Sequence, residues 1–156
     1  EPLSAHATAF EWAFAQYLSF GTMACFRGFE LFDSNATRAV VAKWSAFYRA
    51  HRGILTADVV HLKRPDMQGL DAILHADARD PEGELGMLVV FNPTDAAVET
   101  ELRVPLYYTG LDAKARVEDD AGAASVLALD RGFAVTLPLS CAPRTIRWFL
   151  VTDPDA

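Results

Sequence analysis

The sequence predicts an α+β chain in which a short helix–strand–helix segment precedes an antiparallel β-sandwich. Two observations support this prediction. Apolar residues repeat at helical spacing before about residue 56, whereas from Asp58 onward they alternate with a period of two. Short candidate strands then follow one another, separated by turns rich in Pro, Gly, Asn and Asp, which is typical of a sandwich or barrel. We therefore expect two domains, residues 1–56 and residues 57–156.

The first predicted element is a helix over Ser4–Phe20, and Gly21 ends it. Phe10 and Phe14 lie on one helical stripe, whereas Trp12 lies off it, so the helix is apolar over much of its surface. A helix of that kind is usually buried inside a larger structure.

The second predicted element is a short strand, Thr22–Phe26, whose apolar residues do not alternate with polar ones. Such a run is typical of a strand covered on both faces. A single strand cannot satisfy its own backbone N–H and C=O groups, so neighbouring strands must supply the partners. We expect the strand to belong to a larger parallel sheet outside this sequence; pairing with an edge of the β domain is the alternative hypothesis.

The third predicted element is an amphipathic helix over Ser34–Arg52, with Trp44 and Phe47 on its apolar face. Asp33 or Ser34 would cap its start, and we expect Gly53 to cap its end. After it the sequence predicts the strands of the β domain, which are Asp58–Leu62, Asp71–Ala76, Met87–Asn92, Ala97–Val104, Ala113–Glu118, Ser125–Ala128, Phe133–Leu137 and Thr145–Val151.

Composition excludes several classes of partner. The formal net charge of −7 argues against binding to nucleic acid or to an anionic membrane, because both need clustered Lys and Arg. No apolar run approaches the roughly 18 residues that cross a bilayer. Cys25 and Cys141 are too few for a disulfide framework or a zinc site, and the histidines show no ligand spacing apart from a conceivable meeting of His61 and His75. We therefore expect no metal and no cofactor.

Several segments together resemble a known family. These are "EWAFAQYLSFGTMACFRGFELFDS", "VVAKWSAFYRAHRGILTADVVHLKRPD", "DAILHAD", "GMLVVFNPTD", "LRVPLYYTGL" and "PRTIRWFLV". They resemble the C-terminal end of bacterial α-galactosidase-like glycoside hydrolases, in which a catalytic (β/α)8 barrel is followed by an antiparallel β-sandwich. The resemblance covers nearly the whole chain.

The resemblance implies that residues 1–56 are the last helix–strand–helix elements of such a barrel, and that residues 57–156 are the C-terminal sandwich. A complete barrel needs roughly 250 residues, so most of it would be an intramolecular partner that lies outside this sequence. In the family two Asp residues on earlier strands act as nucleophile and acid/base. No position in this sequence matches them, so the resemblance assigns no catalytic residue here.

Substrate-binding candidates lie where the predicted strand ends, because barrel active sites lie at the C-terminal ends of the strands. Arg27 would donate hydrogen bonds to sugar hydroxyls or hold a catalytic carboxylate, and a structural ion pair is the alternative. Phe26 would stack on a sugar ring or pack in the core. Glu30 would contact the sugar or be a solvated loop acid. In the β domain, Tyr107-Tyr108 and Trp148-Phe149 would stack on carbohydrate or pack inward.

The leading prediction is a C-terminal fragment of a glycoside hydrolase that cleaves O-glycosidic bonds, with α-galactosides as the class that the resemblance names. The carbohydrate substrate would bind through the parent barrel, and the chain alone would be inactive. The alternative is a stand-alone carbohydrate-binding or interaction β-module with a helical N-terminal extension. A secreted or periplasmic parent fits the sequence, which does not itself assign a compartment.

Overall fold

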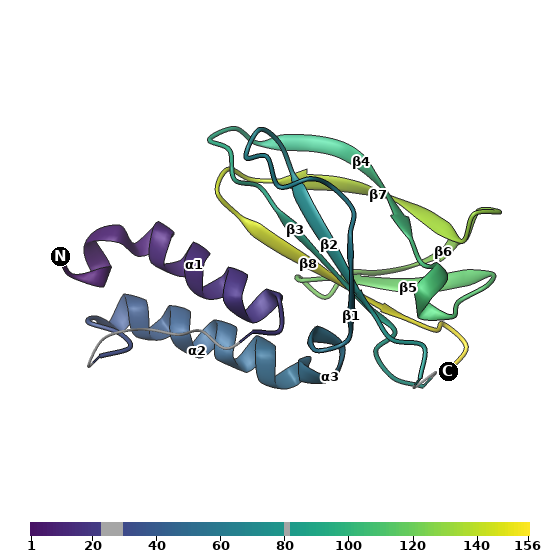
Figure 1. The fold of residues 1–156 in the computed structure, drawn as a ribbon, viewed down its shortest axis with the longest axis horizontal. Helices are drawn as coiled ribbons and strands as arrows, with labels where there is room; N and C mark the ends of the chain where they lie inside the picture. Colours follow the sequence, from purple (N-terminus) through teal and green to yellow (C-terminus); the bar gives the residue numbers. More distant parts are fainter. Residues whose placement is uncertain (23–29, 80–81) are drawn as a thin grey trace. The chain divides into compact units, whose positions relative to one another are not determined.

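The computed structural model describes residues 1–22, 30–79 and 82–156. The chain divides into two compact units, Glu1–Thr56 and Ala57–Ala156 (Figure 1). Within the described ranges, no helix has both the length and the apolar character that crossing a bilayer requires. All but the first residue of the predicted strand Thr22–Phe26 lies outside these ranges, so that strand stays a prediction.

The described residues of the first unit form four helical elements, of which α1 and α2 lie side by side (Figure 1). Their bounds are η1 Leu3–His6, α1 Ala7–Ser19, α2 Asn35–Ala50 and α3 Arg52–Leu55. A carboxylate of α1 joins the two longer helices, because Glu11 Oε1 accepts hydrogen bonds from Lys43 Nζ at 2.8 Å and from the Trp44 indole at 3.0 Å. The apolar stripe of α1 is buried at Phe10, Phe14 and Leu18.

The C-terminus of α1 closes in a Schellman motif, which explains why Gly21 stands there. The amide of Thr22 donates to the carbonyl of Tyr17, and the amide of Gly21 donates to that of Leu18, both at 3.0 Å. This pattern needs a left-handed residue after the C-cap, and Gly21 has a φ of 69°. Because only glycine adopts that conformation without a steric penalty, the predicted stop at Gly21 is confirmed.

The end of α2 differs from the prediction. The helix ends at Ala50 with His51 as its C-cap, and Gly53 lies inside the next turn, α3, instead of capping α2. The reason is that the backbone continues into another hydrogen-bonded turn, in which the amide of Leu55 donates to the carbonyl of His51 at 3.0 Å. The prediction that Gly53 is the C-cap is therefore wrong.

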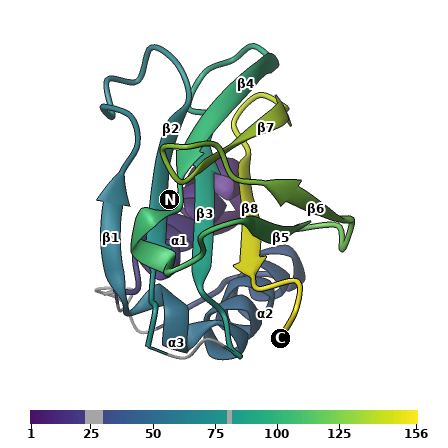
Figure 2. The ribbon, with the colours of Figure 1, turned by 90° about the vertical axis from the view of Figure 1, so that its right-hand side faces the viewer.

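The second unit is built from antiparallel strands in two layers (Figures 1 and 2). A six-stranded sheet has the order β1-β2-β3-β8-β5-β6, and β4 pairs with β7 as a separate two-stranded sheet. The bounds are β1 Asp58–His61, β2 Asp71–Ala76, β3 Gly86–Phe91, β4 Val98–Pro105, β5 Lys114–Asp119, β6 Ala124–Ala128, β7 Ala134–Cys141 and β8 Ile146–Thr152. Each predicted strand is present. The bounds of β2 match the prediction, and no strand end differs from its predicted position by more than four residues, so the α+β prediction is confirmed.

The core of the sandwich lies between the two sheets and draws on both. Along β7 buried and exposed residues alternate, so one face of the strand supplies Val135, Leu137 and Leu139 to the core. The large sheet supplies Leu74 of β2 and Leu88 of β3 among others. This shared core makes the two sheets a sandwich, because neither sheet could bury its apolar face alone.

A buried asparagine fixes two loops of the sandwich. The Asn92 side chain donates to the carbonyls of Ala96 and Ala142, each at 2.8 Å, while its oxygen accepts from the hydroxyl of Thr94 at 2.8 Å. A buried amide with its partners satisfied in this way holds the two loops together. The predicted turn after β3 is confirmed, and Asn92 has a structural role in it.

Candidate functional site

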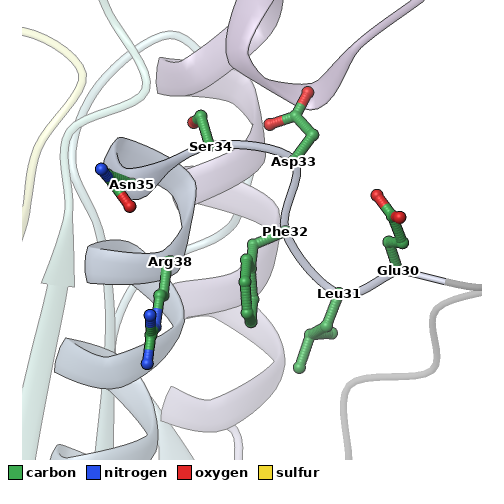
Figure 3. A pocket seen from close by; sticks show the side chains of 7 residues that line it. All are labelled: Glu30, Leu31, Phe32, Asp33, Ser34, Asn35 and Arg38. Atoms are coloured by element: carbon green, nitrogen blue, oxygen red, sulfur yellow. The ribbon is translucent and has the colours of Figure 1, made fainter.

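The structure describes only part of the predicted substrate-binding set. Phe26 and Arg27 lie outside the described residues, so their roles stay predictions. Glu30 is described and is exposed to solvent. It stands at the edge of a shallow depression of about 680 Å³ at the start of α2 (Figure 3), which is lined by Glu30, Leu31, Phe32, Asp33, Ser34, Asn35 and Arg38.

The depression lies at the capped N-terminus of α2. Ser34 is the N-cap, and its hydroxyl accepts a hydrogen bond from the amide of Thr37 at 3.2 Å. The Thr37 hydroxyl in turn accepts from the amide of Ser34 at 3.1 Å, which completes a capping box. Reciprocal capping satisfies two backbone donors that the helix leaves open. The loop is therefore fixed where it joins the helix.

The Asp33 carboxylate accepts three hydrogen bonds, two from Ser4 and one from Thr37. Its carboxylate accepts from the amide of Ser4 at 3.0 Å, from the Ser4 hydroxyl at 3.2 Å and from the Thr37 hydroxyl at 3.0 Å. The hydrogen bond from the Ser4 amide is the main reason why the pKa of Asp33 lies below its ordinary value. Asp33 thus ties the start of the chain to α2 as a hydrogen-bond acceptor.

Phe32 and Arg38 lie next to each other on the other side of the depression (Figure 3). The guanidinium carbon of Arg38 lies 5.7 Å from the centroid of the Phe32 ring, within the range of a cation–π contact. Both side chains are exposed. Together with Leu31 they give the depression an apolar part and a cation, and the exposed Glu30 lies on its opposite side (Figure 3).

This arrangement does not supply a hydrolytic pair of acids. Glycoside hydrolysis uses two carboxyl groups that face the same bond, one of which must donate a proton. Asp33 already accepts three hydrogen bonds, and its lowered pKa favours the carboxylate over the acid form that donates a proton. Of the two acids in the loop, Glu30 alone is therefore available to contact a substrate.

A second group of side chains stands out in the β unit, around η2, Tyr107–Thr109. Tyr107 and Tyr108 are exposed, and Phe133 from the turn before β7 lies beside Tyr107. The sequence pointed to the two tyrosines but placed Phe133 at the start of a strand. It lies in a turn instead, with a φ of 56°, so β7 begins one residue later.

The structure assigns no binding role to the pair Trp148-Phe149, to the described cysteine or to a metal site. Phe149 is buried in the sandwich core and Trp148 is half-buried, so this pair forms no exposed platform. Cys141 is buried, which raises the pKa of its thiol and disfavours the reactive thiolate. Cys25 lies outside the described residues. Among the residues that are described, no group of three or more His, Cys, Asp and Glu side chains is placed to hold a metal ion.

The comparisons with known proteins rest on fold. No family model matches the chain, and a search of curated proteins by sequence finds no match. Solved structures do match. A β-L-arabinopyranosidase of glycoside hydrolase family 27 from Geobacillus stearothermophilus is similar at a TM-score of 0.57 and 14% identity, over 92% of this chain and 30% of that one.

Two further structures show how broad the likeness is. A protein from Bacteroides fragilis assigned as an α-galactosidase matches at a TM-score of 0.59 and 13% identity, over 92% of this chain and 28% of that one. An α-amylase from Geobacillus thermoleovorans matches at a TM-score of 0.59 and 10% identity, over 94% and 34% of the two chains. The chain therefore has the fold of about a third of these glycoside hydrolases, which confirms at the level of fold the resemblance to α-galactosidase-like enzymes.

Proposed function

We propose that this chain is the C-terminal part of a glycoside hydrolase that cleaves O-glycosidic bonds, with α-galactosides as its substrate class. The single observation that carries the proposal is the fold likeness, because it covers more than nine tenths of this chain and only about 30% of each similar enzyme. A fold alone does not define a reaction, so the substrate class rests on the family resemblance of the sequence together with the neighbours that are assigned as α-galactosidases.

In this proposal the unit Glu1–Thr56 supplies the last elements of the barrel, and the unit Ala57–Ala156 is the accessory sandwich. The loop that carries Glu30 then follows the last barrel strand, on the side of the barrel where substrates bind. Arg27 and Phe26 share that loop or the strand end. Arg27 would donate to sugar hydroxyls or to a catalytic carboxylate, Phe26 would stack on a sugar ring, and Glu30 would accept from a hydroxyl.

The catalytic carboxylates lie outside this chain in the proposal. The loop supports this assignment, because Asp33 is engaged with Ser4 and Thr37 and leaves Glu30 without a second acid in the same loop. The sandwich then has no part in bond cleavage. Its role is to support the barrel, and the chain on its own is inactive.

The experiment that tests the proposal is a hydrolysis assay on the parent protein, expressed from the coding sequence that includes the segment upstream of Glu1. The substrates are 4-nitrophenyl α-D-galactopyranoside, β-L-arabinopyranoside and α-N-acetyl-D-galactosaminide. We expect turnover of the α-galactoside above that of a mock preparation. Turnover of none of the three would overturn the glycosidase proposal, whereas turnover of another glycoside alone would correct the substrate class.

A further inference from the structure

We propose that Tyr107, Tyr108 and Phe133 form a glycan-binding surface on the β unit, which we call the aromatic corner. The choice of a sugar as the occupant rests on the proposed function, since a glycoside hydrolase works on carbohydrate chains. The corner itself is defined by the structure, and its three residues come from two segments that are more than twenty positions apart in the sequence. It would hold a glycan by stacking and by hydrogen bonds from the tyrosine hydroxyls.

The three rings are exposed although they are large and apolar. The relative exposure is 63% for Tyr107, 61% for Tyr108 and 38% for Phe133. Their rings nevertheless contact one another, with centroid distances of 5.3 Å between the tyrosines and 5.6 Å between Tyr107 and Phe133. Single exposed hydrophobic residues need no explanation, but a contiguous exposed group of aromatic rings marks an interaction site.

The fold fixes the Phe133 ring at this position through the turn that carries it. The carboxylate of Asp130 accepts hydrogen bonds from the amides of Gly132 at 2.8 Å and Ala134 at 3.0 Å. Arg103 of β4 binds the same carboxylate at 2.8 Å. The carbonyl of Phe133 accepts from the amide of Leu106 at 2.7 Å, which connects the turn to the segment with the two tyrosines. The corner is therefore preorganised.

Phe133 has an unfavourable backbone conformation in this turn. Its φ of 56° lies in the left-handed region, which a bulky aromatic residue rarely adopts. Glycine adopts it without strain, and Gly132 directly precedes Phe133 in the chain. Strained residues of this kind persist where the surroundings determine them, and they concentrate at binding sites. A large exposed ring at a position that suits glycine points to a use for the ring.

The shape of the corner selects among glycans. The Tyr107 ring makes an interplanar angle of 85° with Tyr108 and of 72° with Phe133, so the rings do not share a plane. A flat β-linked polysaccharide would need coplanar rings to stack along its length. An angular group fits a bent α-linked chain or a side branch, whose C–H groups face the electron-rich surface of a ring. Tyr107, the middle ring, is the expected main contact.

The test uses affinity electrophoresis of the 156-residue chain in native gels that contain guar galactomannan, soluble starch or hydroxyethylcellulose. We expect retardation by galactomannan or starch and none by hydroxyethylcellulose. Tyr107→Ala and Phe133→Gly should each weaken the retarding affinity about tenfold, as the loss of one stacked ring does. Phe133→Gly is the sharper variant, because glycine tolerates the backbone angle and so the turn should fold at least as well.

The matched control is Val126→Ser, which removes an exposed apolar side chain of β6 and should leave the retardation unchanged. Equal mobility of the wild-type chain in all gels would overturn the proposal, and so would retardation that Phe133→Gly does not reduce. Sedimentation velocity tests whether the corner binds a second copy of the chain instead of a glycan. Self-association that Phe133→Gly abolishes, without glycan retardation, would assign the corner to a dimer and overturn glycan binding.

Failure of glycan binding at the aromatic corner can be distinguished from failure of the glycosidase proposal. Hydrolysis of the nitrophenyl α-galactoside tests the parent enzyme and does not depend on the corner, since the substrate is a single sugar. Hydrolysis without retardation would reject the aromatic corner and leave the glycosidase proposal standing. Retardation without hydrolysis would do the reverse.

Discussion

The carbonyl oxygen of Leu55 in α3 occupies the space that a β-carbon on Gly21, the residue that ends α1, would need. A β-carbon at position 21 would overlap this oxygen and the adjoining carbonyl carbon. The close approach brings the C-terminal end of α1 against α3, and it occurs at a residue that also has a left-handed φ of 69°. Two independent constraints therefore require glycine at this position.

Replacement of Gly21 by alanine should lower the stability of the helical unit for two reasons, the left-handed backbone and the steric overlap with Leu55. Gly122 provides the comparison, because its φ is 83° but a β-carbon at that position would have no neighbour within 4 Å. We expect Gly122→Ala to cost about 1–2 kcal/mol from conformation only, and Gly21→Ala to cost clearly more because backbone must move. Denaturant unfolding followed by circular dichroism measures both. Equal losses would show that the Leu55 contact is unimportant.

The Glu11 carboxylate should make the helical unit sensitive to acid. Burial raises its pKa, but hydrogen bonds from Lys43 and Trp44 outweigh this effect, so the pKa lies below its ordinary value of 4.5. A lowered folded pKa contributes stability that is present above the unfolded pKa and is lost as the pH falls through the folded one. We expect the helical signal to melt at lower temperature as the pH drops below about 4.5.

Glu11→Gln should remove that pH dependence while keeping an acceptor for the indole. Glu11→Ala should also leave the buried indole N–H of Trp44 without this acceptor, at a cost of about 1–3 kcal/mol. Melting curves at pH 3.5 and pH 7 for both variants provide the measurement. A wild-type chain whose stability does not change between these pH values would contradict the assigned role of Glu11.

The turn that carries Phe133 should persist in mild acid. The Arg103 guanidinium, with the amides of Ala134 and Gly132, holds the pKa of Asp130 below its ordinary value of 3.8. The turn should therefore be intact above pH 3.8 and loosen only as the pH falls through the lower folded pKa. The chemical shifts of the Phe133 ring protons, followed as the pH is lowered, measure the loosening of the turn. Arg103→Met should move the transition to higher pH, and an unchanged midpoint would show that Arg103 does not influence the carboxylate.

Arg27 and Asp33 should behave differently in the parent enzyme. If Arg27 binds the sugar or a catalytic carboxylate, Arg27→Ala should lower kcat/KM by about tenfold or more, since hydrogen bonds to charged groups are the strong ones. Asp33→Asn should mainly lower the melting temperature, because Asp33 bonds to Ser4 and Thr37 within the fold. Steady-state kinetics and thermal melts of both variants separate the roles. An Arg27→Ala enzyme with wild-type kcat/KM would exclude Arg27 from the site.

Local pattern was sufficient to predict most of the fold. The period-two alternation around Val135–Leu139 and the turn residues that flank each run located the strands, because side-chain alternation and turn chemistry are properties of neighbouring residues. Ser34 was predictable as a cap for the same reason. The error at Gly53 arose because a glycine after a helix ends it only when the following backbone leaves the helical path, and here the chain makes another turn.

The aromatic corner depends on contacts that the sequence does not display. Tyr107 and Tyr108 are adjacent and could be noticed together, but Phe133 reaches them only because β4 and β7 pair along their full length. Its left-handed φ was also hidden, since sequence rules expect glycine or asparagine at such positions. Likewise, no local pattern brings Ser4 to Asp33, which meet because α1 packs on α2.

The most direct test of the proposed function compares the purified 156-residue chain with the parent protein in one assay, the release of nitrophenol from 4-nitrophenyl α-D-galactopyranoside. In the proposal the catalytic carboxylates lie outside this chain. We therefore expect the parent to turn over the substrate and the chain alone to be indistinguishable from a mock preparation. Turnover by the chain alone, abolished by Glu30→Gln, would contradict the proposal.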